Sequence, residues 1–173
     1  MTIPWFSANI PGPKQARVVT PEIAAKILSK VGRKMMLCGS GIKGQKIGKE
    51  PIQKYILDLS KEMSVVVAPS VLKDFLEMGA EPVAKGVVEV TNLLRDAEWR
   101  GFDGKGNYDM VAYLGFPYYL ESQMLSVLKH FSDIKTMSLG RFYQPNADYS
   151  FDNLKEKEWE KNFENLISLL RRK

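Results

Sequence analysis

Short apolar runs alternate with amphipathic stretches along most of this 173-residue chain. Each run is continuously apolar, which is typical of strands buried on both faces of a parallel sheet. Between the runs, apolar residues recur at helical spacing. The predicted strands span residues 35–38, 65–68, 110–114 and 134–139. This repeat predicts an α/β fold in which helices cover both faces of a parallel sheet.

The predicted helices carry end signals and apolar faces. Thr20 and Pro21 suit the N-cap and the first turn of a helix, and Glu22 adds an early acid. The final helix is expected to begin near Asp152 or Asn153. Its buried face is expected to consist of Trp159, Phe163, Leu166, Ile167 and Leu170. The helix that follows residue 114 is expected to bury Leu120, Met124, Val127, Leu128 and Phe131.

The first 19 residues differ from the rest of the chain. Three prolines among them indicate an extended arm rather than a helix, and Trp5 and Phe6 make this arm unusually apolar. Either these two side chains pack on the chain's own surface or they are anchors for another subunit, where aromatic residues are enriched. We therefore divide the chain into an extended arm, residues 1–19, and a single domain, residues 20–173.

One cysteine, Cys38, and one histidine, His130, limit the chemistry of this chain. Together they cannot hold a structural zinc, an iron-sulfur cluster or a disulfide framework, so we expect any metal to belong to a partner. A Ser/His triad would depend on His130 alone. We expect Cys38 to be a small buried hydrophobe and His130 to lie on the surface, and we assign no catalytic residue.

The net charge of +5 is unevenly distributed. Residues 1–50 hold nine Lys or Arg and two Glu, whereas residues 51–173 hold sixteen basic and eighteen acidic residues. The basic third is interpreted as solvated surface, an anionic-ligand site or a site for an acidic protein. No nucleic-acid motif is present, and no apolar run approaches the ~20 residues of a membrane helix. We expect a soluble, cytoplasmic protein without nucleic-acid or membrane partners.

A glycine-rich loop directly follows the first predicted strand. Its sequence, Gly39-Ser40-Gly41-Ile42-Lys43-Gly44, matches G-x-G-x-x-G, in which glycines let the backbone approach a pyrophosphate. Gly48 and Pro51 delay the next helix, and no carboxylate ends the second strand to hold an NAD ribose. A P-loop is also excluded, because Gln45 stands where that motif needs Lys. A nucleotide or flavin in a variant site and a long βα loop without a ligand both remain open.

Ligands of open parallel sheets bind beyond the carboxyl ends of the strands, which locates the candidate cofactor-binding residues. These are Gly39, Ser40, Gly41, Lys43, Gly44, Pro69, Ser70, Gly115 and Phe116. Tyr118 and Tyr119 follow the third strand and either stack on a ligand ring or pack within the protein. The spacing of Asp103, Asn107 and Asp109 resembles a calcium loop without its closing Glu, so we interpret them as turn formers.

Three stretches of the chain carry a resemblance to a known family. They are TPEIAAKILSKVGRKMMLCG (residues 20–39), NYDMVAYLGFPYYLESQMLSVLKHFSDIKTMSL (residues 107–139) and YQPNADYSFDNL (residues 143–154). Over nearly its whole length the chain resembles the epsilon subunit of the archaeal carbon monoxide dehydrogenase/acetyl-CoA decarbonylase/synthase complex. These stretches indicate membership rather than mechanism.

The resemblance implies a three-layer, Rossmann-like, doubly wound α/β domain of the deoxyhypusine-synthase-like NAD/FAD-binding type. It implies a partner, the large alpha subunit that carries the nickel-iron-sulfur clusters and oxidises CO, in an alpha2-epsilon2 assembly within a larger complex. The epsilon subunit would stabilise the alpha subunit or help to pass electrons to FAD. The alternative is a free-standing nucleotide- or flavin-binding oxidoreductase.

Overall fold

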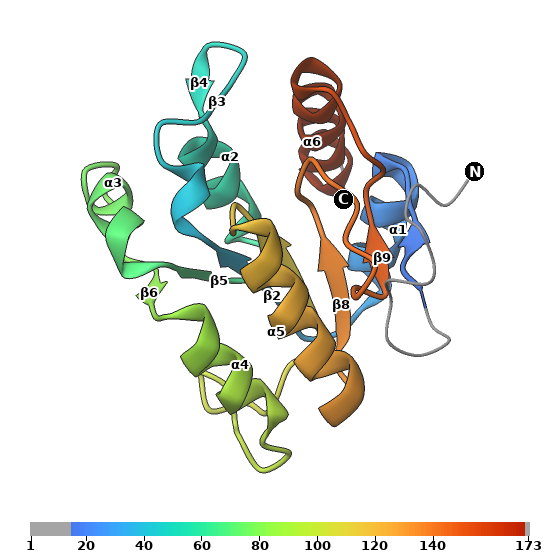
Figure 1. Cartoon of the computed structure of the whole chain (residues 1–173). Helices are drawn as coiled ribbons and strands as arrows, with labels where there is room; N and C mark the ends of the chain where they lie inside the picture. Colours follow the sequence, from blue (N-terminus) through green and yellow to red (C-terminus); the bar gives the residue numbers. More distant parts are fainter. Residues whose placement is uncertain (1–14, 172–173) are drawn as a thin grey trace.

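The computed structural model describes residues 15–171 of the chain (Figure 1). Its main feature is a parallel sheet whose strands are β1 (Arg17–Val18), β2 (Lys34–Cys38), β5 (Ser64–Val67), β6 (Val83–Ala84), β7 (Met110–Leu114), β8 (Lys135–Ser138) and β9 (Tyr149–Ser150). In the described residues these seven strands pair in the order β1-β9-β8-β7-β2-β5-β6. All six pairings are parallel.

The strand order is that of a doubly wound sheet. Counted along the chain from β2, the strands from β6 to β9 stand in the order 3-2-1-4-5-6, with β1 added at the far edge. This is the strand order of a Rossmann-like sheet. The predicted fold class is therefore confirmed, and the winding reverses between β2 and β7, where ligands of such sheets bind.

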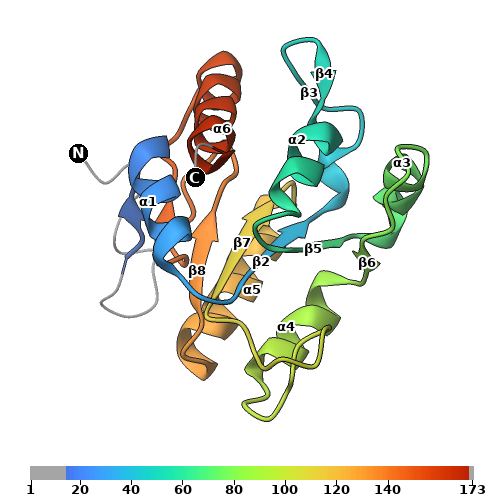
Figure 2. The same ribbon diagram turned by 180° about the vertical axis from the view of Figure 1, so that it is seen from behind.

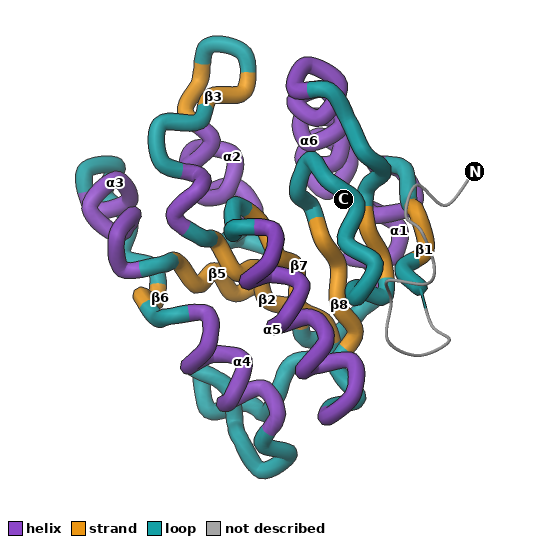
Figure 3. Tube along the Cα trace, viewed as in Figure 1, coloured by secondary structure: helices purple, strands orange, loops and turns teal. Residues whose placement is uncertain are grey.

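Helices cover both faces of the sheet (Figures 1, 2 and 3). They are α1 (Pro21–Lys30), α2 (Ile52–Leu59), α3 (Leu72–Leu76), α4 (Val87–Arg95), α5 (Tyr118–Phe131) and α6 (Glu156–Arg171). One apolar cluster joins the sheet to α1, α2 and α6, and a second joins its other face to α4 and α5. The short α3 lies beside the edge strand β6 (Figure 1).

The sequence predicts the start of the first helix correctly, but not the start of the last helix. Thr20 caps α1, its Oγ1 accepting the Ile23 N–H at 3.4 Å, as predicted. Helix α6 buries the predicted stripe but begins at Glu156 rather than near Asp152. The Asn153 side chain instead accepts the Tyr143 N–H at 3.0 Å. The N–H of Leu154 donates to the Arg141 carbonyl, two residues before Tyr143. Long-range bonds therefore outweigh the local helix signal there.

The predicted face of α5 is only partly right, because Leu128 is buried as predicted but the buried stripe is otherwise different. Its buried positions are Glu121, Leu125 and Leu128, whereas Phe131 is 65% exposed. The sequence pattern favours a stripe of apolar residues as the buried face, because an acid is rarely buried without a partner. The true stripe contains an acid, which shows that something polar lies beneath this end of the helix.

The shortest strands were not predicted. Strand β1, at the end of the predicted arm, pairs with β9, and the hairpin of β3 (Lys46–Ile47) and β4 (Glu50–Pro51) lies between the glycine loop and α2. A two-residue strand is too short to show a periodicity in the sequence. Strand β1 is defined by its long-range pairing with β9, and β3 and β4 are defined by their pairing with each other. Trp5 and Phe6 lie outside the described residues.

Two features are absent from residues 15–171. No helix in this part of the chain is long and apolar enough to cross a membrane. Within the same residues, no group of three or more His, Cys, Asp or Glu side chains is placed to hold a metal ion.

Candidate functional site

The glycine loop contacts the end of β7 at the point where the winding reverses. A Cβ atom on Gly39 would lie 2.3 Å from the Gly115 carbonyl oxygen, and one on Gly41 would lie 2.7 Å from the same atom. Gly115 has a φ of +75°, and a Cβ there would lie 2.6 Å from Cγ2 of Ile42. Only residues without a side chain permit this approach. The contact between the two loops thus explains these three glycines.

Most backbone donors of the loop are already used. The N–H groups of Gly39 and Gly41 donate to the carbonyls of Leu114 and Gly115, at 2.8 Å each. The N–H groups of Ile42 and Lys43 donate to carbonyls within the loop. A phosphate site needs free N–H groups, which these positions do not offer. The exposed Lys43 remains as a cation beside the loop.

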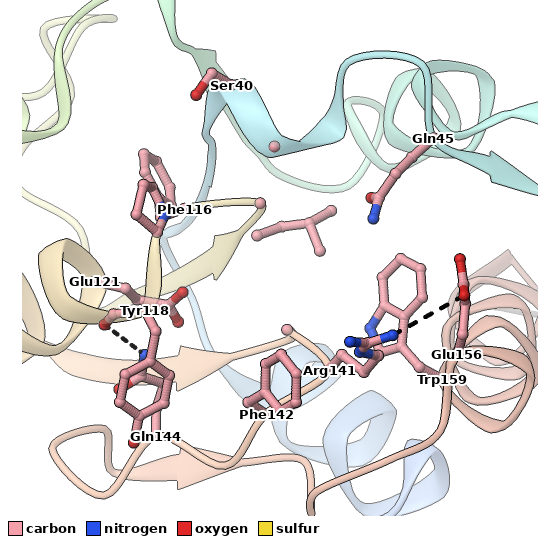
Figure 4. Close-up of a pocket in the computed structure, with 15 residues that line it drawn as sticks. Ser40, Gln45, Phe116, Tyr118, Glu121, Arg141, Phe142, Gln144, Glu156 and Trp159 are labelled. Atoms are coloured by element: carbon pink, nitrogen blue, oxygen red, sulfur yellow. Dashed lines mark hydrogen bonds and ion pairs between the residues drawn. The ribbon is translucent and has the colours of Figure 1, made fainter.

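A pocket of about 490 Å³ opens next to this contact, beyond the carboxyl ends of β2, β7 and β8 (Figure 4). Of the predicted site residues, it brings together Ser40, Gly41, Gly115 and Phe116. Gly39 lies against Phe116 at the pocket's edge. The other predicted residues do not line it: Lys43 and Gly44 belong to a shallower depression beside it, and Pro69 and Ser70 are exposed at the end of β5.

Aromatic side chains form much of the pocket wall: Phe116, Tyr118, Phe142 and Trp159. Two of them are held in place by hydrogen bonds. The Trp159 Nε1 donates to the Leu139 carbonyl at 2.8 Å, and the Tyr118 hydroxyl donates to a backbone carbonyl at 3.1 Å. The apolar lining and fixed rings suit a planar ligand.

A buried carboxyl group lines the same pocket. Glu121 is only 3% exposed, and its Oε1 accepts the Ser138 hydroxyl at 2.6 Å. Burial raises the pKa of Glu121 to about 7, although the bond from Ser138 acts in the opposite direction. Because the pKa is near neutrality, this group changes protonation state in the physiological range.

Gln144 supplies a second buried polar group. It is 1% exposed, and its Nε2 donates to the Tyr118 carbonyl at 3.0 Å (Figure 4). Its Oε1 is buried without a hydrogen-bond partner. An unpaired buried oxygen costs about 1–3 kcal/mol, so Gln144 is a locally unfavourable feature of the folded chain.

Charged side chains stand at the mouth of the pocket. Arg141 lies 4.0 Å from Glu156, and its guanidinium stands 4.7 Å from the centroid of the half-exposed Phe142 ring. Such an exposed pair holds its geometry weakly. Arg141 is therefore a cation at the mouth of the pocket that is not tightly held by its acidic neighbour.

The chain matches a family model described as CO dehydrogenase beta subunit/acetyl-CoA synthase epsilon subunit, over residues 1–169. It is 39% identical over 167 residues to the acetyl-CoA decarbonylase/synthase complex subunit epsilon of Methanothermobacter thermautotrophicus, covering 96% of this chain and 95% of the relative. The chain belongs to this epsilon-subunit family.

Two further epsilon subunits extend the likeness. The chain is 38% identical over 151 residues to subunit epsilon 1 of Archaeoglobus fulgidus, covering 85% of this chain and 79% of that protein. It is 35% identical over 158 residues to subunit epsilon of Methanothrix soehngenii, with 88% and 81% covered. The resemblance to the epsilon-subunit family is therefore confirmed, and the matched residues include the whole pocket.

The structure of this epsilon-family chain also tests predictions made for single residues outside the pocket. Cys38 is fully buried, and burial raises the pKa of its thiol, so it is an inert core residue as expected. His130 is exposed, also as expected, and Tyr119 is 69% exposed. Asp103 and Asp109 both bind Arg33, which confirms that they shape their loop.

The sequence analysis missed the two polar groups of the pocket, Glu121 and Gln144. One signal for the acid was present: Glu121, Leu125 and Leu128 recur at helical spacing, so an alternative face of α5 carried a carboxylate. Gln144 had no such signal, because a buried loop amide has no periodicity.

Proposed function

We propose that this chain is the accessory epsilon subunit of a cytoplasmic acetyl-CoA decarbonylase/synthase complex and stabilises its cluster-bearing, CO-oxidising alpha subunit. Its family membership supports this role, because the relatives that it matches over most of their length are named as subunits of that complex. The alpha2-epsilon2 arrangement implied by the resemblance is part of the proposal.

The surface that carries this proposal is the β6 edge of the sheet. Four large apolar side chains there are exposed by 37–51%: Leu76 of α3, Met78 after it, Val83 of β6 and Val88 of α4. Strand β6 pairs only with β5, so its other edge is unpaired among the described residues. Exposed apolar groups along an open strand edge are typical of a protein-binding surface. We call these four residues the β6-edge patch.

A binding measurement with purified alpha subunit tests this surface. Leu76→Glu combined with Val88→Glu places two charges in the β6-edge patch without touching the core. We expect the dissociation constant to rise at least tenfold, because a buried unpaired charge is costly. Ile23→Glu is the matched control, because Ile23 is 44% exposed on α1 and lies outside the patch. Equal affinity of the patch variant and the control would remove the β6 edge from the proposal.

The arm supplies an independent test. Trp5 and Phe6 would be interface anchors if the sharper interpretation of the arm holds. Deletion of residues 1–12 should then weaken association with the alpha subunit while leaving the circular dichroism spectrum unchanged. Unchanged association would exclude the arm from the interface.

Flavin binding for electron transfer is a second candidate function. It is favoured by the pocket at the carboxyl ends of the strands, which has the size and aromatic walls for a flavin ring. When bound, a flavin would accept electrons from CO oxidation. Arg141 or Lys43 would attract its phosphates.

Titration of the protein with FAD tests this second function. Lys43→Glu should weaken FAD binding, and more so at low salt, whereas Lys26→Glu on α1 should not. Absence of saturable FAD binding by the wild-type chain would reject the candidate. Turnover of a nicotinamide or flavin substrate by the isolated chain would instead favour the free-standing oxidoreductase.

A further inference from the structure

The pocket at the carboxyl ends of the strands contains an acid that has no cationic partner. Glu121 lines this pocket and is 3% exposed, and within residues 15–171 no Lys, Arg or His forms an ion pair with it. The other charged residues of the lining, Arg141 and Glu156, lie 4.0 Å apart at the mouth and largely offset each other. When Glu121 is ionised, the lining therefore carries one uncompensated negative charge.

The Glu121 carboxyl has one oxygen in use and one oxygen that is available to the pocket. Oε1 accepts the Ser138 hydroxyl at 2.6 Å. Oε2 has no hydrogen-bond partner among the described residues, yet it is not one of the unpaired polar atoms that are sealed from solvent. Gln144 Oε1, by contrast, is sealed. Because Glu121 lines the pocket (Figure 4), its Oε2 is a buried acceptor that a ligand can contact.

The surroundings of Glu121 do little to stabilise its negative charge. Burial raises its pKa to about 7, and the hydrogen bond from Ser138 opposes only part of this effect. The titratable groups nearest to it on β7 and α5 are the hydroxyls of Tyr113 and Tyr118, which carry no positive charge. Their own pKa values are raised, mainly by burial and in part by the charge of Glu121. A ligand cation beside Oε2 would favour the ionised carboxyl.

The aromatic walls of the pocket suit the same kind of ligand. A cation is attracted to the face of an aromatic ring, and a guanidinium or amidinium can also donate N–H groups to a carboxylate. One wall already shows such a contact, because the guanidinium of Arg141 stands 4.7 Å from the centroid of the Phe142 ring. The buried acid and the rings therefore favour the same class of ligand.

We propose that this pocket binds a planar nitrogen cation, an amidinium or a guanidinium, whose N–H groups donate to Glu121 Oε2 and whose plane contacts the aromatic wall. The cavity volume of about 490 Å³ lies within the range of small-molecule sites. A flavin ring would bring no positive charge to Glu121, so the inference goes beyond both proposed functions and rests on neither.

The experiment compares benzamidine, a planar cation, with benzamide, its neutral counterpart of nearly the same shape. Dissociation constants are measured with the full chain by calorimetry at pH 6 and pH 8. At pH 8, benzamidine should bind at least tenfold more tightly than benzamide. Its affinity should fall about tenfold at pH 6, in proportion to the ionised fraction of a group that titrates near 7, whereas that of benzamide should change far less.

Proton release gives a second readout that needs no variant. At pH 6 the free Glu121 carboxyl is mostly protonated, and a bound cation should ionise it. About one proton should then pass to the buffer for each benzamidine bound, and none for benzamide. Repeating the titration in buffers of different ionisation enthalpy measures this number. Carboxyl groups with ordinary pKa values are already ionised at pH 6, so the released proton identifies the buried acid.

Glu121→Gln tests the named residue, because it removes the charge and keeps the size of the side chain. Benzamidine should then bind no better than benzamide at either pH, and the proton release should disappear. Glu98→Gln is the matched control, because it makes the same change at an exposed position outside the pocket. It should leave the preference for benzamidine, its pH dependence and the proton release as in the wild type.

Two sources can supply such a cation, a free small molecule and an arginine side chain of the alpha subunit. Saturating benzamidine should weaken association with the alpha subunit if the source is an arginine, and should leave association unchanged if it is a small molecule. Equal affinity of benzamidine and benzamide, pH-independent binding by the wild type, or a preference retained in Glu121→Gln would each overturn the inference. None of these three results would affect the assembly role or the titration with FAD.

Discussion

Glu121 illustrates how one residue links the pocket to the stability of the fold. Burial raises its pKa from 4.5 to about 7, a difference that corresponds to about 3 kcal/mol. A carboxyl with a raised pKa favours the folded state below the unfolded pKa, and this contribution is lost as the pH rises through the folded pKa. The loss should therefore occur between pH 4.5 and 7.

Glu121→Gln tests this linkage by chemical denaturation. Between pH 4.5 and 7 the wild type should lose about 1.4 kcal/mol of unfolding free energy per pH unit relative to the variant. The contributions of the other titrating groups cancel in the difference between the two pH profiles, because both proteins share these groups. Parallel pH profiles of wild type and variant would contradict the buried, neutral Glu121.

The glycines of the loop make a second prediction at this scale. Gly39→Ala would place a Cβ atom 2.3 Å from the Gly115 carbonyl oxygen, so backbone atoms must separate. We expect a loss of about 3 kcal/mol or more, in the range of severe core changes. Gly44→Ala is the control in the same loop: it meets no atom within 4 Å, and its φ of +71° costs only about 1 kcal/mol. Similar losses for the two variants, measured by urea denaturation, would refute the close approach.

At the scale of elements, much of the structure could be predicted. The sequence predicts β2, β5, β7 and β8 to within one residue at each end, because continuous apolar runs reflect burial on both faces. The face of α6 was also correct. The start of α6 and strand β1 could not be predicted, since distant hydrogen bonds decide them. The face of α5 is mispredicted because its buried stripe contains an acid.

The loop of residues 101–109 shows such a distant contact. The Arg33 N–H donates to Asp109 Oδ2 at 2.8 Å, and its guanidinium donates to Asp103 Oδ1 at 2.6 Å and to the Asn107 carbonyl at 3.2 Å. The hydrogen bond from Arg33 lowers the pKa of Asp103 to about 2, so this ion pair persists in mildly acidic solution. One side chain thus organises a loop more than sixty residues away.

Arg33→Leu should loosen this loop without unfolding the protein. We expect amide hydrogen exchange within residues 101–109 to accelerate at least tenfold, because the guanidinium bonds are lost. Global stability should fall by about 1 kcal/mol or less, since the ion pair is partly exposed. Arg100→Leu, at an exposed position beside the same loop, should leave exchange unchanged. Unchanged exchange in Arg33→Leu would contradict the role of the guanidinium in holding the loop.

For the whole molecule, the sequence predicted the fold class and the family, and only part of the site. The strand ends located the pocket, because a doubly wound sheet binds ligands where its winding reverses. Ser40, Gly41, Gly115 and Phe116 line it as expected, whereas the chemistry at its buried end depends on Glu121 and Gln144. Those two are brought together only by the folded chain.

The role proposed for this chain is that of an accessory subunit that binds a CO-oxidising metalloprotein. The most direct test is affinity purification of the tagged chain from its native extract without oxygen, followed by assays for nickel, iron and CO-dependent dye reduction. We expect a large nickel- and iron-containing subunit with this activity to co-purify, and to be lost when Leu76 and Val88 are both changed to Glu. Recovery of the wild-type chain alone, without metal or CO-dependent activity, would contradict the proposed assembly.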